Sequence, residues 1–261
     1  MKPSLLRRQL DLQRRRVPYA VCTVADAKGS VPGKVGFSMI VTAESAWGTV
    51  GGGGLEERAK SMAREALRTG GSGLVRLDLA AWKPGGLDSV CGGTVDIAIQ
   101  VVRAGPRLLL VGGGHVAKAL ADVAAGLEWP VAVLDDRPDY ATRERWPRAD
   151  EVLCGEFGPT LAKLDLDAFS HVYLLGYSHH KDVDALVAIL RSGFAGVVGV
   201  VGSTAKLTSM RDRALAAGVA EASLARVRSP IGVDVGAETP EEIAVAVAAE
   251  IIRDTKQADA R

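Results

Sequence analysis

The sequence predicts an α/β protein, with a Rossmann-like doubly wound parallel sheet preceded by a smaller N-terminal α+β domain. The first observation is the order strand, glycine turn, helix and second strand over Leu108–Asp136, which is typical of a dinucleotide-binding βαβ unit. The second is the alternation of strand and helix patterns after it, which indicates helical crossovers between parallel strands. The third is a β-rich pattern before Arg103–Pro106. We therefore place the domains at 1–103 and 107–261.

The composition is that of a soluble globular chain long enough for two domains. Its 261 residues are 24% charged, and the net charge of +1 predicts no nucleic-acid partner. Cys22, Cys91 and Cys154 form no zinc or disulfide spacing, which favours a cytoplasmic location. No apolar run approaches the roughly 18 residues of a membrane span, so no membrane partner is expected. The basic N-terminus reads as a helix rather than a signal peptide.

Before the boundary, short alternating runs predict strands and one longer apolar face predicts a helix. The helix has Leu55, Ala59 and Met62 at three- and four-residue spacing. The expected helices are Met1–Arg16 and Leu55–Leu67, and the expected strands are Tyr19–Ala25, Phe37–Val41, Trp47–Val50, Leu74–Leu79 and Thr94–Val102.

After the boundary, apolar runs of strand length alternate with amphipathic helices. The last helix has Thr239 as N-cap and Pro240 at its first position. The expected strands are Arg107–Val111, Val131–Leu134, Glu151–Leu153, Val172–Leu175 and Val197–Val201. The expected helices are His115–Leu127, Asp182–Arg191, Thr208–Ala217 and Pro240–Thr255.

The glycine turn after the first C-terminal strand is a candidate phosphate site. Gly112 would make the tight turn, and Gly114 would let a phosphate approach the backbone at a helix N-terminus. Asp135 lies near the offset of a ribose-binding acid, with Asp136 beside it. The loop could hold NAD, another phosphorylated ligand or nothing, and His115 could contact a phosphate or point to solvent.

Two loops of the N-terminal domain can likewise be interpreted either as binding sites or as structural features. The run Gly51–Gly54 before a helix indicates either an anion site or a tight packing turn. Glu56 either takes part in that site or complements the helix dipole. In Cys91-Gly92-Gly93, the glycines favour an accessible thiol, a nucleophile or soft-metal ligand, over a buried cysteine. Cys22 and Cys154 are expected in the core.

Polar residues also follow two later strands, where a doubly wound sheet lines its ligand crevice. His179 and His180 follow one of these strands, and at most one is expected to reach a ligand. Ser203 and Lys206 follow the next, either as phosphate ligands or as a cap and a solvated lysine. No catalytic triad or paired-carboxylate arrangement is visible, so we assign no catalytic residue.

Together these motifs resemble the XdhC/CoxI family, the accessory factors of xanthine dehydrogenase and related molybdenum hydroxylases. In the N-terminal half the resemblance rests on Gly29–Pro32, Gly48–Glu56 and Cys91–Gly93. In the C-terminal half it rests on Val111–Ala117, Asp135–Pro138, Gly202-Ser203 and Pro230–Ala244.

The resemblance implies a cofactor-binding chaperone rather than a catalyst. Such a protein binds molybdenum cofactor as cargo, protects it during sulfuration and helps deliver it to an apo-hydroxylase of the xanthine dehydrogenase type. A cysteine desulfurase is the other expected partner, and a homodimer is one open oligomeric state. Cys91 is the expected contact to the metal or its sulfur. The expected cofactor-binding residues are Gly51, Gly52, Gly53, Glu56, Cys91, Gly92, Gly93, Gly112, Gly114, His115, Asp135, Asp136, His179, Ser203 and Lys206.

Two other interpretations stay open. The Rossmann half could serve an NAD(P)-dependent oxidoreductase, although no hydride-acceptor site is visible. The chain could also be a scaffold for the hydroxylase with purely structural glycine loops. Under the favoured interpretation, the ligand site lies between the domains, at the carboxyl ends of the parallel strands.

Overall fold

The computed structural model describes residues 2–79, 92–202 and 204–259, and it has the expected α/β fold class. The chain divides into two compact units after Ala104, within the segment Arg103–Pro106. The second unit spans Gly105–Ala258. Each unit has its own sheet and its own buried core.

The N-terminal unit is built on a five-stranded antiparallel sheet in the order β3-β2-β1-β5-β4. The strands are β1 (Tyr19–Lys28), β2 (Ser38–Val41), β3 (Ala46–Gly48), β4 (Gly73–Asp78) and β5 (Thr94–Val102). Alternate residues of β1 point to opposite faces, as the period of two requires. Ala20 and Cys22 therefore join one apolar cluster, while Tyr19 and Val21 join another.

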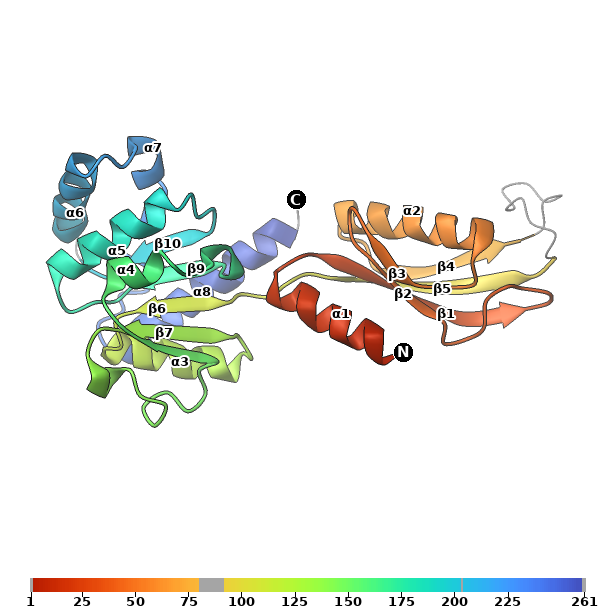
Figure 1. The fold of residues 1–261 in the computed structure, drawn as a ribbon, viewed down its shortest axis with the longest axis horizontal. Coiled ribbons are helices and arrows are strands. Elements are labelled where there is room, and N and C mark those ends of the chain that lie inside the picture. Colours follow the sequence, from red (N-terminus) through yellow and green to blue (C-terminus); the bar gives the residue numbers. More distant parts are fainter. Residues whose placement is uncertain (1, 80–91, 203, 260–261) are drawn as a thin grey trace. The chain divides into compact units, whose positions relative to one another are not determined.

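A helix covers each face of this sheet (Figure 1). Helix α2 (Gly53–Thr69) buries Leu55, Ala59, Ala63 and Ala66 against the face that carries Cys22. Helix α1 (Pro3–Arg14) buries Leu5 and Leu12 against the other face. Cys22 is fully buried, as expected, and burial raises the pKa of its thiol to about 12.

The second unit is a six-stranded parallel sheet in the order β11-β10-β9-β6-β7-β8. The strands are β6 (Leu108–Val111), β7 (Val131–Asp135), β8 (Glu151–Cys154), β9 (His171–Leu174), β10 (Val197–Val200) and β11 (Val227–Arg228). The first strand, β6, lies between β7 and β9, so the strand order reverses there. Ligands of open α/β sheets bind at the carboxyl ends of strands near such a reversal.

Helices cover both faces of the parallel sheet (Figure 1). Helices α3 (His115–Gly126) and α8 (Pro240–Asp259) pack on the face of Leu108 and Leu110. Helices α5 (His179–Arg191) and α6 (Thr204–Ala216) pack on the face of Leu109 and Val111. The shorter elements are α4 (Phe157–Leu161), α7 (Glu221–Leu224) and the 3-10 turns η1 (Pro138–Tyr140) and η2 (Leu166–Ala168).

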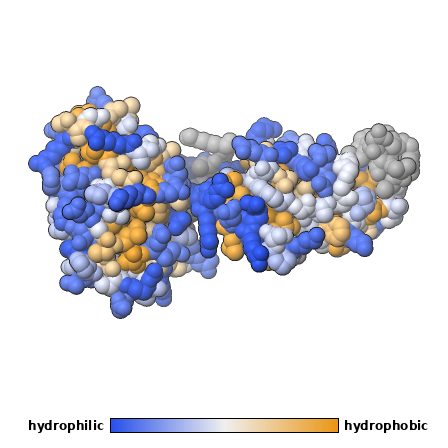
Figure 2. Space-filling model, in the orientation of Figure 1, coloured by the Kyte–Doolittle hydropathy of each residue, from blue (hydrophilic) through white to orange (hydrophobic). Residues whose placement is uncertain are grey.

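One core assignment made from the sequence is wrong. Cys154 is exposed, because it is the last residue of β8 and β8 is an edge strand with one neighbour in the sheet. Hydrophilic side chains lie over much of the visible face of each unit, with apolar patches between them (Figure 2). Within residues 2–79, 92–202 and 204–259, no helix has the length and apolar character needed to cross a bilayer.

Candidate functional site

In the N-terminal unit, the loop after β1 and the glycine run before α2 pack backbone against backbone. A Cβ on Gly33 would collide with the carbonyl oxygen of Val50. A Cβ on Gly51 would lie 2.7 Å from the amide nitrogen of Gly33, and Gly51 also has a φ of +141°. Both positions therefore require glycine, and this close contact favours the tight-packing interpretation for Gly51.

The loop that precedes β5 joins the same cluster. A Cβ on Gly93 would collide with the carbonyl oxygen of Lys28, and one on Gly29 would lie 3.1 Å from the Cα of Gly93. Gly92 and Gly93 therefore lie against the loop after β1. Cys91 itself lies outside the described residues. The three motifs that carried the N-terminal resemblance thus meet at these glycines, and we call this backbone cluster the glycine cradle.

The next three glycines of the run have open space where a side chain would be. Apart from the adjoining residues and the backbone of α2 itself, no heavy atom of the described residues lies within 4 Å of a Cβ built on Gly52, Gly53 or Gly54. Gly52 and Gly53 need glycine for their φ of +83° and +56°, whereas Gly54 has neither constraint. Because the first turn of a helix leaves amide groups without intrahelical acceptors, this open side can admit an anion.

Glu56 is held by its own loop. Its carboxylate accepts a hydrogen bond of 2.6 Å from Thr49 Oγ1 and lies 3.3 Å from Lys60 Nζ. Thr49 Oγ1 in turn accepts from the Gly51 amide at 3.1 Å. This arrangement favours a role in fixing the glycine run, and the Lys60 ammonium offsets the charge of Glu56.

In the second unit, the glycine turn after β6 closes against the loop after β9. Gly112 has a φ of +101°, and a Cβ there would lie 2.7 Å from the Cα of Gly176. A Cβ on Gly114 would have no neighbour closer than 3.9 Å, so that side of the turn is open. His115, which follows, is exposed.

Asp135 points into the protein and holds this turn. It is fully buried, and its carboxylate accepts from the Gly113 amide at 2.6 Å and from Arg137 Nε and Nη2 at 2.8 Å. Burial alone would raise the pKa of Asp135, but these hydrogen bonds outweigh it and hold the pKa below its ordinary value. A ribose hydroxyl would have to displace one of these donors.

Arg137 and Asp136 link the loop after β7 to the segment that follows β9. The Arg137 guanidinium lies over two rings, 3.5 Å from the centroid of Tyr140 and 4.1 Å from that of Tyr177. Such stacking on aromatic faces is favourable. The Asp136 carboxylate forms an ion pair with Lys181 and lies 3.3 Å from the Tyr177 hydroxyl.

Farther along the same edge, Lys206 is engaged by a buried acid. Its Nζ lies 2.7 Å from Asp182 Oδ2 and donates to the Val201 carbonyl at 3.1 Å. Asp182 is fully buried against Gly176, where a Cβ would collide with Asp182 Oδ1. A phosphate at Lys206 would therefore compete with Asp182.

The remaining expected site residues are His179 and Ser203. His179 Nε2 lies 3.1 Å from Ser209 Oγ on α6. Ser203 lies outside the described residues. Among the residues that the structure describes, no group of three His, Cys, Asp or Glu side chains is arranged to hold a metal ion.

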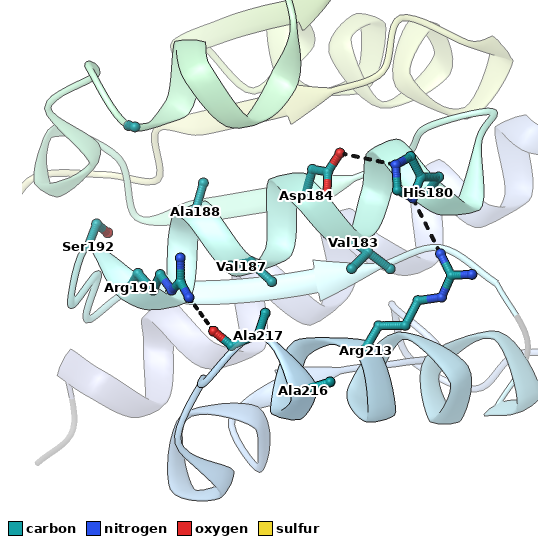
Figure 3. A pocket seen from close by; sticks show the side chains of 11 residues that line it. His180, Val183, Asp184, Val187, Ala188, Arg191, Ser192, Arg213, Ala216 and Ala217 are labelled. Carbon is teal, nitrogen blue, oxygen red and sulfur yellow. Dashed lines mark hydrogen bonds and ion pairs between the residues drawn. The ribbon is translucent and has the colours of Figure 1, made fainter.

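The part of the second unit that the structure describes includes two cavities of note. The smaller, about 250 Å³, opens at the carboxyl ends of the strands between Asp136, the start of α4 and the first turn of α5. The larger, about 830 Å³, is a groove between α5 and α6 with an apolar floor that includes Val183 and Val187. Figure 3 shows Arg213 directed at His180 near one end of the groove and Arg191 directed at the Ala217 carbonyl at the other.

The sequence did not indicate the side chains that surround Asp136 and Arg137. Tyr140, Tyr177 and Lys181 follow no periodic pattern or motif. A weak signal was available, because Tyr177 and Lys181 flank the strand-end histidines in the sequence. Short loops at strand ends of a doubly wound sheet commonly contribute to one crevice.

Comparison with known proteins gives a family match for each of the two units. Residues 12–78 match the XdhC and CoxI family, and residues 108–251 match the XdhC Rossmann domain. The chain is 32% identical over 244 residues to the uncharacterized protein YqeB of Escherichia coli, covering 93% of this chain and 44% of that protein. It is 34% identical over 165 residues to a probable xanthine dehydrogenase subunit of Bacillus subtilis, covering 63% of this chain and 47% of that protein.

The chain therefore spans less than half the length of these two relatives. A crystal structure of a xanthine dehydrogenase from Bacillus halodurans superposes over 96% of both chains with a TM-score of 0.52 at 19% identity, so the fold is shared. The matches to both units confirm the resemblance seen in the sequence, and the chain belongs to the XdhC and CoxI family.

Proposed function

We propose that this chain is an accessory factor of a xanthine dehydrogenase-type molybdenum hydroxylase. In this proposal it binds molybdenum cofactor as cargo, shelters it during sulfuration and helps insert it into the apo-enzyme. Family membership and the name of the Bacillus subtilis relative support the accessory role. The apo-hydroxylase and a cysteine desulfurase are the proposed partners.

The observation that carries the cargo proposal is the glycine cradle. Gly33, Gly51 and Gly93 pack three loops together without side chains, while Gly52–Gly54 leave open space at the start of α2. Backbone amides at a helix N-terminus suit the phosphate of a pterin cofactor. Cys91 precedes Gly92 in the chain, so its thiolate is the proposed contact to the metal or its sulfur.

Gly54→Ala tests the cradle without disturbing its packing. Gly54 has no positive φ, and its Cβ would meet no described atom outside α2 and the adjoining residues, so alanine should raise the free energy of unfolding by about 0.4–1 kcal/mol. The methyl group would stand beside the first-turn amides and obstruct a bound phosphate. We expect cofactor that copurifies under anaerobic conditions, measured as its oxidised pterin, to fall at least about tenfold.

Gly73→Ala is the matched control in the same unit. Gly73 lies at the exposed start of β4, where an added Cβ also meets nothing. It should retain the cofactor content of the unchanged protein. Equal pterin content in both variants and in the unchanged protein would refute the cradle as the binding site.

Cys91→Ala tests the contribution of the thiol independently of the glycine cradle. We expect this variant to hold pterin less tightly or to stop activating the apo-hydroxylase in a reconstitution assay. Retention of both properties would remove Cys91 from the site, without affecting the test at Gly54.

A further inference from the structure

The groove between α5 and α6 is lined by one face of α5 along nearly the whole length of that helix. The α5 residues that line it recur at the three- and four-residue spacing of neighbours on a helix surface. They are His180, Val183, Asp184, Val187, Ala188 and Arg191. At a rise of about 1.5 Å per residue, this face extends over about 16 Å.

Helix α5 is apolar on more than one side. Between residues 183 and 190 its only polar residue is Asp184. Leu186 packs in the core on the parallel sheet, while Val187 and Ala188 are half-buried and line the groove. A helix that is apolar nearly all round is normally covered on every side. The groove face of α5 therefore has the character of a surface that another element covers.

The opposite wall of the groove consists of small side chains. Ala216 and Ala217 line it at the end of α6, and Ala162 lines it after α4. Figure 3 shows Val183 and Val187 on the side of α5 that faces Ala216. The distance between packed helices depends on the side chains at the contact, so small residues allow a close approach. The groove thus offers an apolar floor that a further helix can reach.

An arginine lies at each end of this floor. Arg213 Nη1 lies 3.3 Å from His180 Nδ1, and Arg191 donates to the Ala217 carbonyl. Among the described residues, neither arginine forms an ion pair with a carboxylate. A guanidinium has five N–H donors, so both arginines keep donors for a ligand carboxylate. Asp184 lies 3.8 Å from His180 and offsets part of the positive charge at the Arg213 end.

The shape of the groove favours a helix over a small molecule. Its volume is about 830 Å³, and it is open to solvent. Sites for small ligands typically enclose about 70–90% of the ligand surface, which an open groove does not. A helix of about three turns has the length of the α5 face and can lay one apolar stripe in the groove.

We propose that this groove binds an amphipathic helix of a partner protein, about three turns long, with an apolar stripe and a carboxylate at each end of the stripe. The apolar side chains lie on Val183 and Val187, and the carboxylates pair with Arg191 and Arg213. The inference concerns a protein partner of the second unit. It is independent of the proposed cargo function, which rests on the N-terminal unit.

Fluorescence anisotropy of a labelled peptide, titrated with the full chain, tests the proposal. The probe is an alanine-rich peptide of about 18 residues, long enough to form a helix in water. It carries two glutamates about 11 positions apart and two leucines between them on the same face. We expect a dissociation constant of about 10–100 µM. Peptides with lysine in place of both glutamates, or serine in place of both leucines, should bind at least about tenfold more weakly.

Two substitutions at the rim of the groove should change the affinity in opposite directions. Arg191→Gln should weaken binding of the glutamate peptide about fivefold or more, because a charged donor is lost. Asp184→Asn should strengthen binding about threefold, because a like charge is removed. Local unfolding would not produce a tighter complex. Arg148→Gln, at an exposed arginine that does not line the groove, is the matched control and should leave the affinity unchanged.

Ala216→Trp tests whether the peptide lies in the groove itself. Ala216 is exposed and lines the groove, so an indole at this position fills part of it without entering the core. This variant should bind the glutamate peptide at least about tenfold more weakly while its free energy of unfolding stays within about 0.5 kcal/mol of the unchanged protein.

Absence of binding at millimolar protein concentration, or equal affinity for the glutamate and lysine peptides, would overturn the proposal. Self-association of the chain that both Arg191→Gln and Ala216→Trp abolish would assign the groove to a second copy instead. Displacement of the peptide by micromolar dodecanoate would assign it to a small amphiphile. The Gly54→Ala test of the cargo function has a different readout, pterin content, so the two proposals can fail separately.

Discussion

Replacing Lys206 by methionine should destabilise the second unit, because it removes the ammonium beside a fully buried carboxylate. Lys206 Nζ lies 2.7 Å from Asp182 Oδ2, and Asp182 has an exposed fraction of 0%. Removing one partner of a buried ion pair typically costs about 3–5 kcal/mol. The Lys206 side chain is 23% exposed, so water offsets part of this cost, and we expect about 2–4 kcal/mol near neutral pH.

The loss of unfolding free energy caused by Lys206→Met should become smaller as the pH falls. Burial raises the pKa of Asp182, although Lys206 opposes the shift. A carboxyl group whose pKa is raised in the folded state binds a proton more tightly there than in the unfolded chain. Stability is therefore gained as the pH falls through the folded-state pKa. Without Lys206 that pKa rises further, so the loss of stability in the variant should shrink as the pH is lowered from neutral through the variant's folded-state pKa.

Urea unfolding of the full chain, followed by tryptophan fluorescence, measures both effects, since Trp146 is buried in the second unit. Lys163→Met, at an exposed lysine, should change the free energy of unfolding by no more than about 0.5 kcal/mol. Asp182→Asn should remove most of the loss caused by Lys206→Met in a double-mutant cycle. A loss below about 1 kcal/mol, or one that does not vary with pH, would refute the role assigned to the pair.

Three further predictions concern packing, acid stability and thiol reactivity. Gly33→Ala should cost about 3 kcal/mol or more, seen as a lower thermal midpoint, because its Cβ would collide with a carbonyl oxygen. Arg137→Lys should cost about 2 kcal/mol by loss of the paired hydrogen bonds to Asp135. Because the pKa of Asp135 is lowered in the folded state, its ionised carboxylate stabilises the protein fully above about pH 4. This stabilisation is lost as the pH falls through the folded-state pKa. The free energies of unfolding of the Arg137→Lys variant and the unchanged protein should therefore become equal in acid. Iodoacetamide at mildly alkaline pH should modify exposed Cys154 and spare buried Cys22, as judged by peptide mass spectrometry.

Long, regular elements could be predicted from the sequence because their patterns have enough periods to be distinctive. The alternation in β5 placed both of its ends, at Thr94 and Val102, and the glycine turn placed the first residue of α3 at His115. The elements α4, α7 and β11 were missed. They contain five, four and two residues, too few to display a period.

The candidate site was only partly predictable, since side-chain direction and strand order are absent from a linear pattern. Asp135 ends β7 and Asp136 follows it, and only the structure shows that Asp135 turns inward while Asp136 lines the cavity. Cys154 was expected in the core because the sequence does not tell which strand forms the edge of the sheet. The neighbours of Asp136 come from a different loop, so no local motif could assemble them.

The glycine cradle also limits how this protein can change during evolution. Its contact surfaces are main-chain atoms at Gly29, Gly33, Gly51 and Gly93, and a peptide group has the same polarity whatever residue bears it. Substitution at these positions would separate the loops instead of giving the surface a new character. Variation among variants that still fold should therefore collect at the rim, at positions such as Gly54, where a side chain has room. Differences in what such variants bind would then come from side chains around the glycine cradle, while the main-chain atoms of the cradle stay the same.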